Sequence, residues 1–191
     1  RVASRGLGDV YKRQVYMSLN CGQGSKDNKK NIKKNLALVL KKIKVERKKL
    51  ALMYQTHSNK VIIINKKNKD LIKFKSDAII TKIKGLALGV VTADCVPIIL
   101  FDLQNKIIGC VHAGWKGALS GIIENTIKKF KKLNSNNKVF ATIGPCIGSK
   151  SYEVDLDFYN KFMVKSKKNN IYFVNKKKKK LFNLRKYVID K

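Results

Sequence analysis

Short apolar runs alternating with amphipathic stretches constrain the fold of this chain more than any other feature. Apolar runs of four to seven residues are typical of strands, and they lie at 50–55, 60–64, 77–81, 86–92, 96–101, 107–111 and 139–143. Amphipathic stretches with helical periodicity lie at 27–44, 118–132 and 156–165. The pattern predicts an α/β (α+β) fold, a single domain of mixed β-sheets flanked by helices. The run at 86–92 is apolar throughout, which favours a strand buried on both faces.

The 191 residues are enough for one sizeable core, so we expect one domain over 15–191. Residues 1–14 are rich in Gly and Arg, unlike the rest, and we interpret them as a non-native or remnant segment. A hairpin turn is expected at Asn105 and Lys106. The Lys-rich end of the chain, beyond the helix at 156–165, shows no clear pattern, and we expect it to be partly frayed.

A formal net charge of +31 first suggests a nucleic-acid-binding protein. Only 5 of the 43 basic residues are Arg, however, and the Lys residues are spread along the chain. Proteins that recognise phosphates and bases specifically favour Arg, because its guanidinium donates two parallel hydrogen bonds. We therefore expect a solvated Lys-rich surface and no specific nucleic-acid partner. The longest apolar run, 85–100, is interrupted by Asp94 and is too short to span a membrane, and we expect a cytoplasmic protein.

The chain has two His and four Cys, and three of these residues stand out. His57, Cys95 and His112 each follow a predicted strand, where a rigid scaffold meets an open loop. Two imidazoles and a thiolate suit zinc, and three protein ligands leave one position open, as in catalytic sites. Their spacings of 38 and 17 residues match no standard zinc signature. Taken singly, each His could simply be hydrogen-bonded and Cys95 could be packing.

Five motifs occur in a fixed order and resemble one family. They are Gln-Thr-His-Ser at 55–58, Asp-Ala-Ile-Ile-Thr at 77–81, Thr-Ala-Asp-Cys-Val-Pro at 92–97, Val-His-Ala-Gly-Trp-Lys-Gly at 111–117 and Ile-Gly-Pro-Cys-Ile-Gly at 143–148. Together they are similar to the YfiH family, also called the laccase-domain or polyphenol-oxidase family, now regarded as purine nucleoside phosphorylases. The resemblance implies that His57, Cys95 and His112 bind the metal, with Zn²⁺ preferred to Cu²⁺. It also implies cleavage of adenosine and related nucleosides by phosphate; some relatives deaminate adenosine or cleave methylthioadenosine.

Other residues are weaker candidates. Asp94 is either a general base or a positioning partner for a ligand, unless it is only a turn residue. Lys116 stands where relatives usually carry Arg and could attract phosphate as a point charge. Ser18 and Asn20 match the family's Ser-Leu-Asn stretch and could contact the nucleoside, unless they only hydrogen-bond their own turn. We expect Trp115 to be a packing residue.

Two departures from the family pattern shape our expectations for the ends of the chain. Residues 1–14 occupy the place of the family's Arg-x-Gly-Gly-x-Ser stretch and do not match it. Relatives also continue through a further helix and strand, so we expect a catalytic domain truncated at both ends.

Three other functions compete with this prediction. A copper-dependent polyphenol oxidase of the multicopper kind needs many His, and this chain has two. A metal-free hydrolase or deamidase would use Cys95 as nucleophile and His112 as base. A non-enzymatic nucleic-acid binder rests on net charge alone. The oligomeric state is not predicted.

Overall fold

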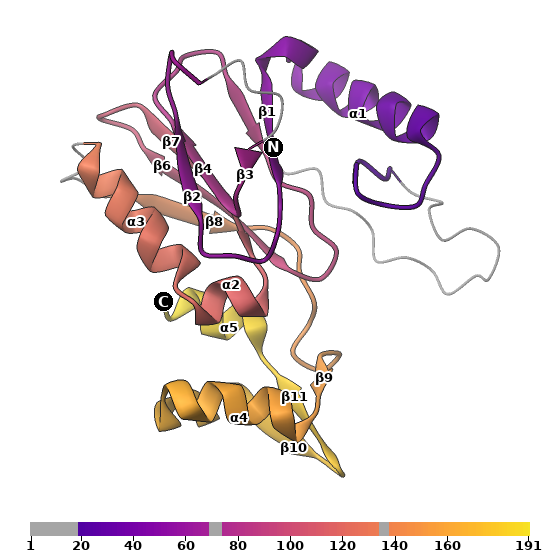
Figure 1. The fold of residues 1–191 in the computed structure, drawn as a ribbon, viewed down its shortest axis with the longest axis vertical. Helices are drawn as coiled ribbons and strands as arrows, with labels where there is room; N and C mark the ends of the chain where they lie inside the picture. Colours follow the sequence, from indigo (N-terminus) through magenta and orange to yellow (C-terminus); the bar gives the residue numbers. More distant parts are fainter. Residues whose placement is uncertain (1–18, 69–73, 134–137) are drawn as a thin grey trace.

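The computed structural model describes residues 19–68, 74–133 and 138–191, and its centre is a five-stranded sheet (Figure 1). The strand order is β2-β4-β7-β6-β8, with β2 parallel to β4 and the other pairs antiparallel. The strands are β2 (Val61–Ile64), β4 (Ala78–Thr81), β6 (Val96–Asp102), β7 (Ile107–Ala113) and β8 (Phe140–Ile143). The structure confirms the predicted mixed α/β domain, including the β6–β7 hairpin around Asn105 and Lys106.

Helices α2 (Trp115–Leu119) and α3 (Ile122–Lys132) cover one face of this sheet. Phe130 of α3 packs so closely on β7 that a Cβ at Gly109 would lie 2.7 Å from its ring. The single helix predicted over 118–132 is wrong. The backbone of Gly121 has φ of +91°, a left-handed conformation that ends α2 and starts α3 in a new direction. The division leaves α2 as a short element directly after β7.

The opposite face of the central sheet packs against a small parallel sheet with the order β3-β1-β5. Its strands are β3 (Phe74–Lys75), β1 (Leu50–Tyr54) and β5 (Ala87–Gly89), and a short 3-10 helix, η1 (Arg47–Lys49), precedes β1. The strand predicted over 86–92 is wrong in length and burial, because β5 is half-buried and has only three residues. It pairs with one neighbour, β1, and residues 90–95 leave the sheet as a loop.

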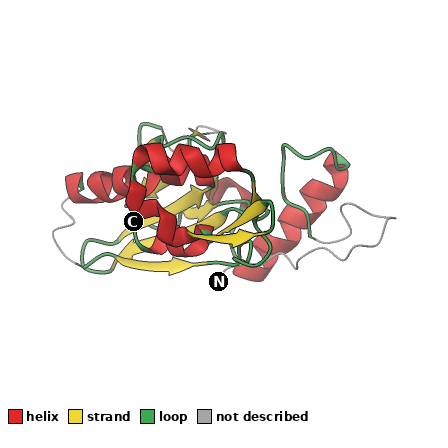
Figure 2. Cartoon of the chain, turned by 90° about the horizontal axis from the view of Figure 1, so that it is seen from below, coloured by secondary structure: helices red, strands yellow, loops and turns green. Residues whose placement is uncertain are grey.

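Helix α1 (Lys29–Ile43) confirms the first predicted helix. The Asn28 side chain caps its start by accepting a hydrogen bond from the backbone N–H of Lys30. Ile32, Leu36 and Leu40 form its buried stripe, whereas Leu38 is 51% exposed. In Figure 1, α1 stands to one side of the sheets, and Figure 2 shows the helices arranged around the layer of strands.

The last fifth of the chain forms a lobe below the central sheet (Figure 1). It contains a three-stranded sheet of order β10-β11-β9 and the helix α4, and α5 joins it to the main body. The elements are β9 (Glu153–Val154), α4 (Leu156–Lys165), the 3-10 helix η2 (Lys167–Tyr172), β10 (Phe173–Lys176), β11 (Lys179–Phe182) and α5 (Leu184–Ile189). Helix α4 confirms the prediction at 156–165.

The expected fraying after α4 is wrong. Phe162, Phe182 and Tyr187 are fully buried there, with ring centroids 4.7 Å apart for Phe162 and Phe182 and 5.1 Å apart for Phe162 and Tyr187. The ring centroids of Trp115 of α2 and Phe158 of α4 are 4.8 Å apart, which confirms the predicted packing role of Trp115. The Lys residues between these aromatic positions hide their periodicity in the sequence. Within the described residues, no helix has the length and apolarity to cross a membrane.

Candidate metal centre

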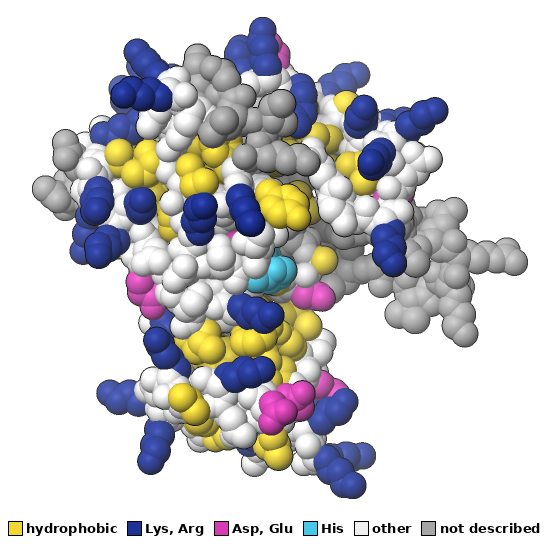
Figure 3. Space-filling view, viewed as in Figure 1, with side chains coloured by type: hydrophobic (Ala, Val, Ile, Leu, Met, Phe, Trp, Pro, Cys, Tyr) yellow, Lys and Arg dark blue, Asp and Glu magenta, His cyan; other side chains and the backbone are white. Residues whose placement is uncertain are grey.

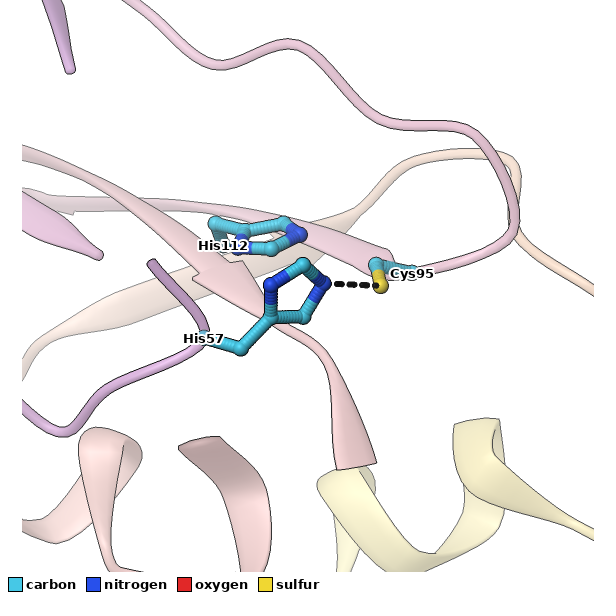
Figure 4. A group of neighbouring side chains, drawn as sticks. All are labelled: His57, Cys95 and His112. Atoms are coloured by element: carbon cyan, nitrogen blue, oxygen red, sulfur yellow. Dashed lines mark hydrogen bonds between the residues drawn. The ribbon is translucent and has the colours of Figure 1, made fainter. Parts of the chain in front are cut away.

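Three side chains from distant parts of the chain meet at one end of the central sheet (Figure 4). His57 lies in the loop after β1, Cys95 directly before β6 and His112 near the end of β7. One ligand atom of each residue lies within 4.8 Å of the other two. The Cys95 Sγ lies 3.8 Å from the His57 Nε2, and the two imidazole centroids are 4.8 Å apart. The three residues that the sequence singled out are therefore brought together.

Asp77, at the start of β4, is the residue that organises this cluster. Its Oδ1 lies 2.8 Å from the His112 Nδ1, and both side chains are buried. Because an ionised carboxylate only accepts hydrogen bonds, the Nδ1 of His112 carries the proton and its Nε2 is left for a metal. The motif at 77–81 is recognisable in the sequence, but no role for Asp77 was predicted from it. An acidic residue directly before an apolar run was the available signal.

The same carboxylate shapes the loop that carries His57. Asp77 accepts hydrogen bonds from three consecutive backbone N–H groups, those of Thr56, His57 and Ser58, at 2.7–3.2 Å. It also accepts from the Ser58 hydroxyl at 2.7 Å. These bonds hold His57 in the left-handed region, with φ of +58°, which is uncommon for a residue with a side chain. Asp77 thus fixes both histidines.

The ionisation of Asp77 is fitted to this role. Burial acts to raise its pKa, but the hydrogen bonds from His112 and Ser58 outweigh it and hold the pKa well below the usual range. The carboxylate is therefore ionised at neutral pH and remains an acceptor for all its partners.

Cys95 is held by a loop that does not continue strand β5. The Gln55 side chain donates to the Val91 carbonyl at 2.7 Å and accepts from its N–H at 3.1 Å, which fastens the loop beside His57. Asp94 then adopts φ of +75°, and the chain enters β6. The prediction that Cys95 follows a strand is thus wrong, since it precedes one. The loop holds Cys95 directly before β6, so its position is fixed by the start of that strand.

The protonation of Cys95 and His57 depends on their surroundings. Burial, with the nearby charges of Asp94 and Asp77, raises the pKa of the Cys95 thiol to about 11. Burial and the neighbouring His112 lower the pKa of His57. At neutral pH His57 is therefore a neutral imidazole, ready to bind a cation, whereas Cys95 stays a thiol until a cation displaces its proton.

The cluster fits a divalent metal in its donor types. Tetrahedral zinc with two imidazoles and one thiolate places N and S ligand atoms about 3.5 Å apart, and the Cys95–His57 separation of 3.8 Å is close to this. His57 is exposed, Cys95 half-buried and His112 buried, so the cluster opens to solvent on one side. Figure 3 shows histidine surface, in cyan, in the notch between the main body and the lower lobe.

Gly114 has no side chain, and the space where one would lie is occupied by His57 and Cys95. A Cβ at this position would lie 2.7 Å from the His57 Cδ2 and 3.0 Å from the Cys95 Sγ. We expect Gly114→Ala to lower zinc affinity by tenfold or more, on the order expected when ligands are misplaced. Competition with a chromophoric chelator measures this affinity. Gly24→Ala is the control, since nothing lies within 4 Å of its added Cβ, and equal affinities for both variants would contradict the prediction.

Of the weaker candidates, Asp94 and Lys116 lie beside the cluster. Asp94 is exposed and its charge acts on Cys95. Lys116 is exposed on α2, where its charge acts on His57 and its Nζ lies 5.5 Å from the Trp115 ring centroid. Both positions agree with, but do not test, the roles expected for them.

Asn20 does not join the cluster. Asn20 is buried and donates both amide protons, at 2.9 Å each, to Ser25 and Asp27, while its Oδ1 accepts from Gly22. Both donors of its amide are thus engaged within its own turn, and its contact with a nucleoside stays a prediction. Ser18, with the segment 1–14, lies outside the described residues.

Tyr152 is a further residue that the sequence did not reveal. Burial raises the pKa of its hydroxyl to about 12, and the charges of Cys95 and Asp94 act in the same direction. Its ring packs against Phe158 and Phe182 of the lower lobe. Tyr152 thus belongs to the aromatic packing of the lower lobe, near enough to Cys95 and Asp94 for their charges to act on its hydroxyl.

Curated relatives are similar in sequence to a large part of this chain. A Rickettsia conorii protein named purine nucleoside phosphorylase is 38% identical over 126 residues, 66% of this chain and 51% of its own. A Haemophilus influenzae protein of the same name is 32% identical over 158 residues, 83% of this chain and 62% of its own. The chain thus spans between about half and three-fifths of the length of these relatives.

Solved structures share the fold. The crystal structure of a Bacillus licheniformis protein, YfiH, superposes with a TM-score of 0.81 and 25% identity, covering 91% of this chain and 69% of that one. A Neisseria meningitidis protein gives a TM-score of 0.78 at 25% identity, covering 93% and 71%. The model of the family described as multi-copper polyphenol oxidoreductase laccase matches residues 3–191. The chain therefore belongs to this laccase-like family, the YfiH family.

Proposed function

We propose that this protein is a zinc-dependent purine nucleoside phosphorylase that cleaves adenosine and related nucleosides with phosphate. The observation that carries the proposal is the cluster of His57, Cys95 and His112, set by Asp77 and open to solvent on one side. The names of the curated relatives supply the reaction class, a nucleoside-processing enzyme. We propose that the enzyme works in the cytoplasm.

In this proposal each residue has a defined task. His57, Cys95 and His112 would hold the zinc, and a zinc with an open position supplies Lewis-acid polarisation of a substrate oxygen. Asp77 keeps both imidazoles oriented through the hydrogen bonds described above. Lys116, exposed beside His57, would attract phosphate, and Asp94, exposed beside Cys95, would act as a general base or hold a metal ligand in position.

The donor set argues against a copper-dependent phenol oxidase of the multicopper kind. Such enzymes hold several ions with many His, and the chain has two, both in one cluster. In the described residues this is the one group of three or more His, Cys, Asp or Glu that could hold a metal ion.

The ionisation of Cys95 argues against a metal-free hydrolase or deamidase. A nucleophilic cysteine needs a lowered pKa, whereas burial raises that of Cys95 to about 11. A nucleic-acid binder has little support either, since Figure 3 shows the basic side chains spread over the visible face without forming one stripe.

The deciding experiment incubates the zinc-loaded protein with adenosine, with and without phosphate, and follows adenine, hypoxanthine and inosine. Adenine that forms only with phosphate supports the proposal. Inosine formed without phosphate would replace phosphorolysis by deamination, and oxidation of a phenol by a copper-loaded sample would restore the laccase reaction. A chelator should remove the activity and zinc should restore it, whereas a Cys–His hydrolase would keep its activity.

A further inference from the structure

A cavity with no assigned role lies between the chain that follows β8 and the start of α5. Residues 143–149, which lead from β8 toward the lower lobe, face Asn183 and Arg185 at the start of α5 across a cavity of about 560 Å³. This volume is within the range of small-molecule sites, about 300–1,000 Å³. The lining combines the apolar side chains of Ile143 and Ile147 with polar groups from Ser149 and Arg185.

Two hydrogen bonds fasten this pocket to the segment that carries Cys95. The Gly144 N–H donates to the Pro97 carbonyl at 3.0 Å, and the Ile147 N–H donates to the Asp94 carbonyl at 2.9 Å. Between these two bonds, Cys146 lies on the segment 144–147 and Cys95 lies on the facing segment 94–97. The pocket wall is therefore hydrogen-bonded directly to the chain on both sides of Cys95.

Arg185 gives this pocket a positive charge. In the part of the chain that the structure describes, no carboxylate lies within ion-pair distance of its guanidinium. Cys146 and Arg185 both line the pocket; burial raises the pKa of the Cys146 thiol, and the charge of Arg185 opposes that shift. Arg185 is exposed at the pocket rim and lies on α5, which is anchored by the buried Leu184 and Tyr187.

We propose that this pocket binds the phosphate group of the reaction, with Arg185 as its principal ligand. The proposal rests on the proposed phosphorolysis, in which inorganic phosphate enters and ribose 1-phosphate leaves. A guanidinium presents two parallel N–H donors to a phosphate, whereas the Lys116 ammonium offers a point charge. The pocket wall is hydrogen-bonded on both sides of Cys95, so the phosphate is held on the Cys95 side of the site, and Lys116 contributes from α2.

The test measures binding of inorganic phosphate and of ribose 1-phosphate separately, by titration calorimetry of the zinc-loaded protein in about 0.15 M salt, which screens the general Lys surface. The variants are Arg185→Gln, Arg185→Lys and the matched control Arg47→Gln. Arg47 lies in η1, where its Nη1 is 3.4 Å from the Leu50 carbonyl. We expect Arg185→Gln to weaken both ligands on the order of tenfold or more, since a hydrogen bond to a charged group is lost. Arg185→Lys should be intermediate and Arg47→Gln unchanged.

Several outcomes would overturn the inference. They are unchanged phosphate affinity in Arg185→Gln, an equal loss in Arg47→Gln, and a loss confined to ribose 1-phosphate, which would place Arg185 on the sugar. The same variants measured in the adenosine assay separate the two proposals. If phosphorolysis occurs with an unchanged KM for phosphate in Arg185→Gln, the pocket assignment fails and the function stands. If no phosphorolysis occurs and Arg185→Gln still loses phosphate affinity, the function fails and the pocket stands.

Discussion

Replacing Cys95 with serine is expected to abolish tight zinc binding and to lower phosphorolysis of adenosine by about a thousandfold. The serine hydroxyl is a poor ligand for zinc, and the remaining imidazoles of His57 and His112 hold a zinc ion weakly. The activity falls with the metal, because a bound Lewis acid stabilises the transition state of such a reaction by several kcal/mol. Each 1.36 kcal/mol of this stabilisation is about tenfold in rate. Metal content by mass spectrometry and adenine release by chromatography measure the two effects.

The matched control is Cys21→Ser, which changes a half-buried thiol that is not in the cluster. It should keep its zinc and its activity. Full zinc content in Cys95→Ser would show that the ion binds elsewhere. Loss of activity with retained zinc would instead make Cys95 a nucleophile, and a covalent adduct should then form at this residue in the wild-type protein.

Replacing Asp77 with asparagine is expected to weaken zinc binding by about 10- to 100-fold and to destabilise the protein by about 3 kcal/mol. The substitution keeps the shape of the side chain but places an NH₂ group against donors. Asp77 accepts from the N–H groups of Thr56, His57 and Ser58 and from the Ser58 hydroxyl, and it contacts His112. A buried amide cannot satisfy all of these, so both histidines lose their orientation. Zinc competition and urea unfolding measure the two changes.

Asp102→Asn is the control for this variant. Asp102 is a buried carboxylate in the same sheet, and it accepts hydrogen bonds from the Asn105 N–H at 3.0 Å and the Asn105 side chain at 2.9 Å. It ends β6, whose other end adjoins Cys95, so about 20 Å of strand separate it from the cluster. We expect Asp102→Asn to lower stability with no change in zinc affinity. Equal zinc affinities in the two variants would refute the role of Asp77.

The lowered pKa of Asp77 also predicts the direction of acid sensitivity. The carboxylate titrates at lower pH in the folded protein than in the unfolded chain, where its pKa is about 3.9. Its contribution to stability is therefore complete well above pH 4 and is lost as the pH falls below that value. Asp77→Asn should show a smaller loss of unfolding free energy between about pH 5 and pH 2 than the wild type. Parallel curves for the two proteins would contradict this.

The sequence by itself determined the residue types of the site and most of the elements that carry them. The scarcity of histidine directed attention to His57 and His112, Cys95 stood out by its place after an apolar run, and five motifs in a fixed order linked the three residues. Local periodicity was enough for α1 and for the β6–β7 hairpin, because the hydrogen bonds and burial stripe of these elements lie within about 20 residues of chain.

Only the tertiary structure decided how those residues work together. Asp77 acts through contacts with residues 19 to 35 positions away, and no local pattern records such a contact. The burial of Phe162, Phe182 and Tyr187 likewise depends on packing between α4, β11 and α5, while the Lys residues between them suggested a frayed end. Local sequence sets backbone conformation and donor chemistry. Burial and convergence depend on pairing between distant segments, and this is why the organising carboxylate and the Arg185 pocket emerged only from the folded chain.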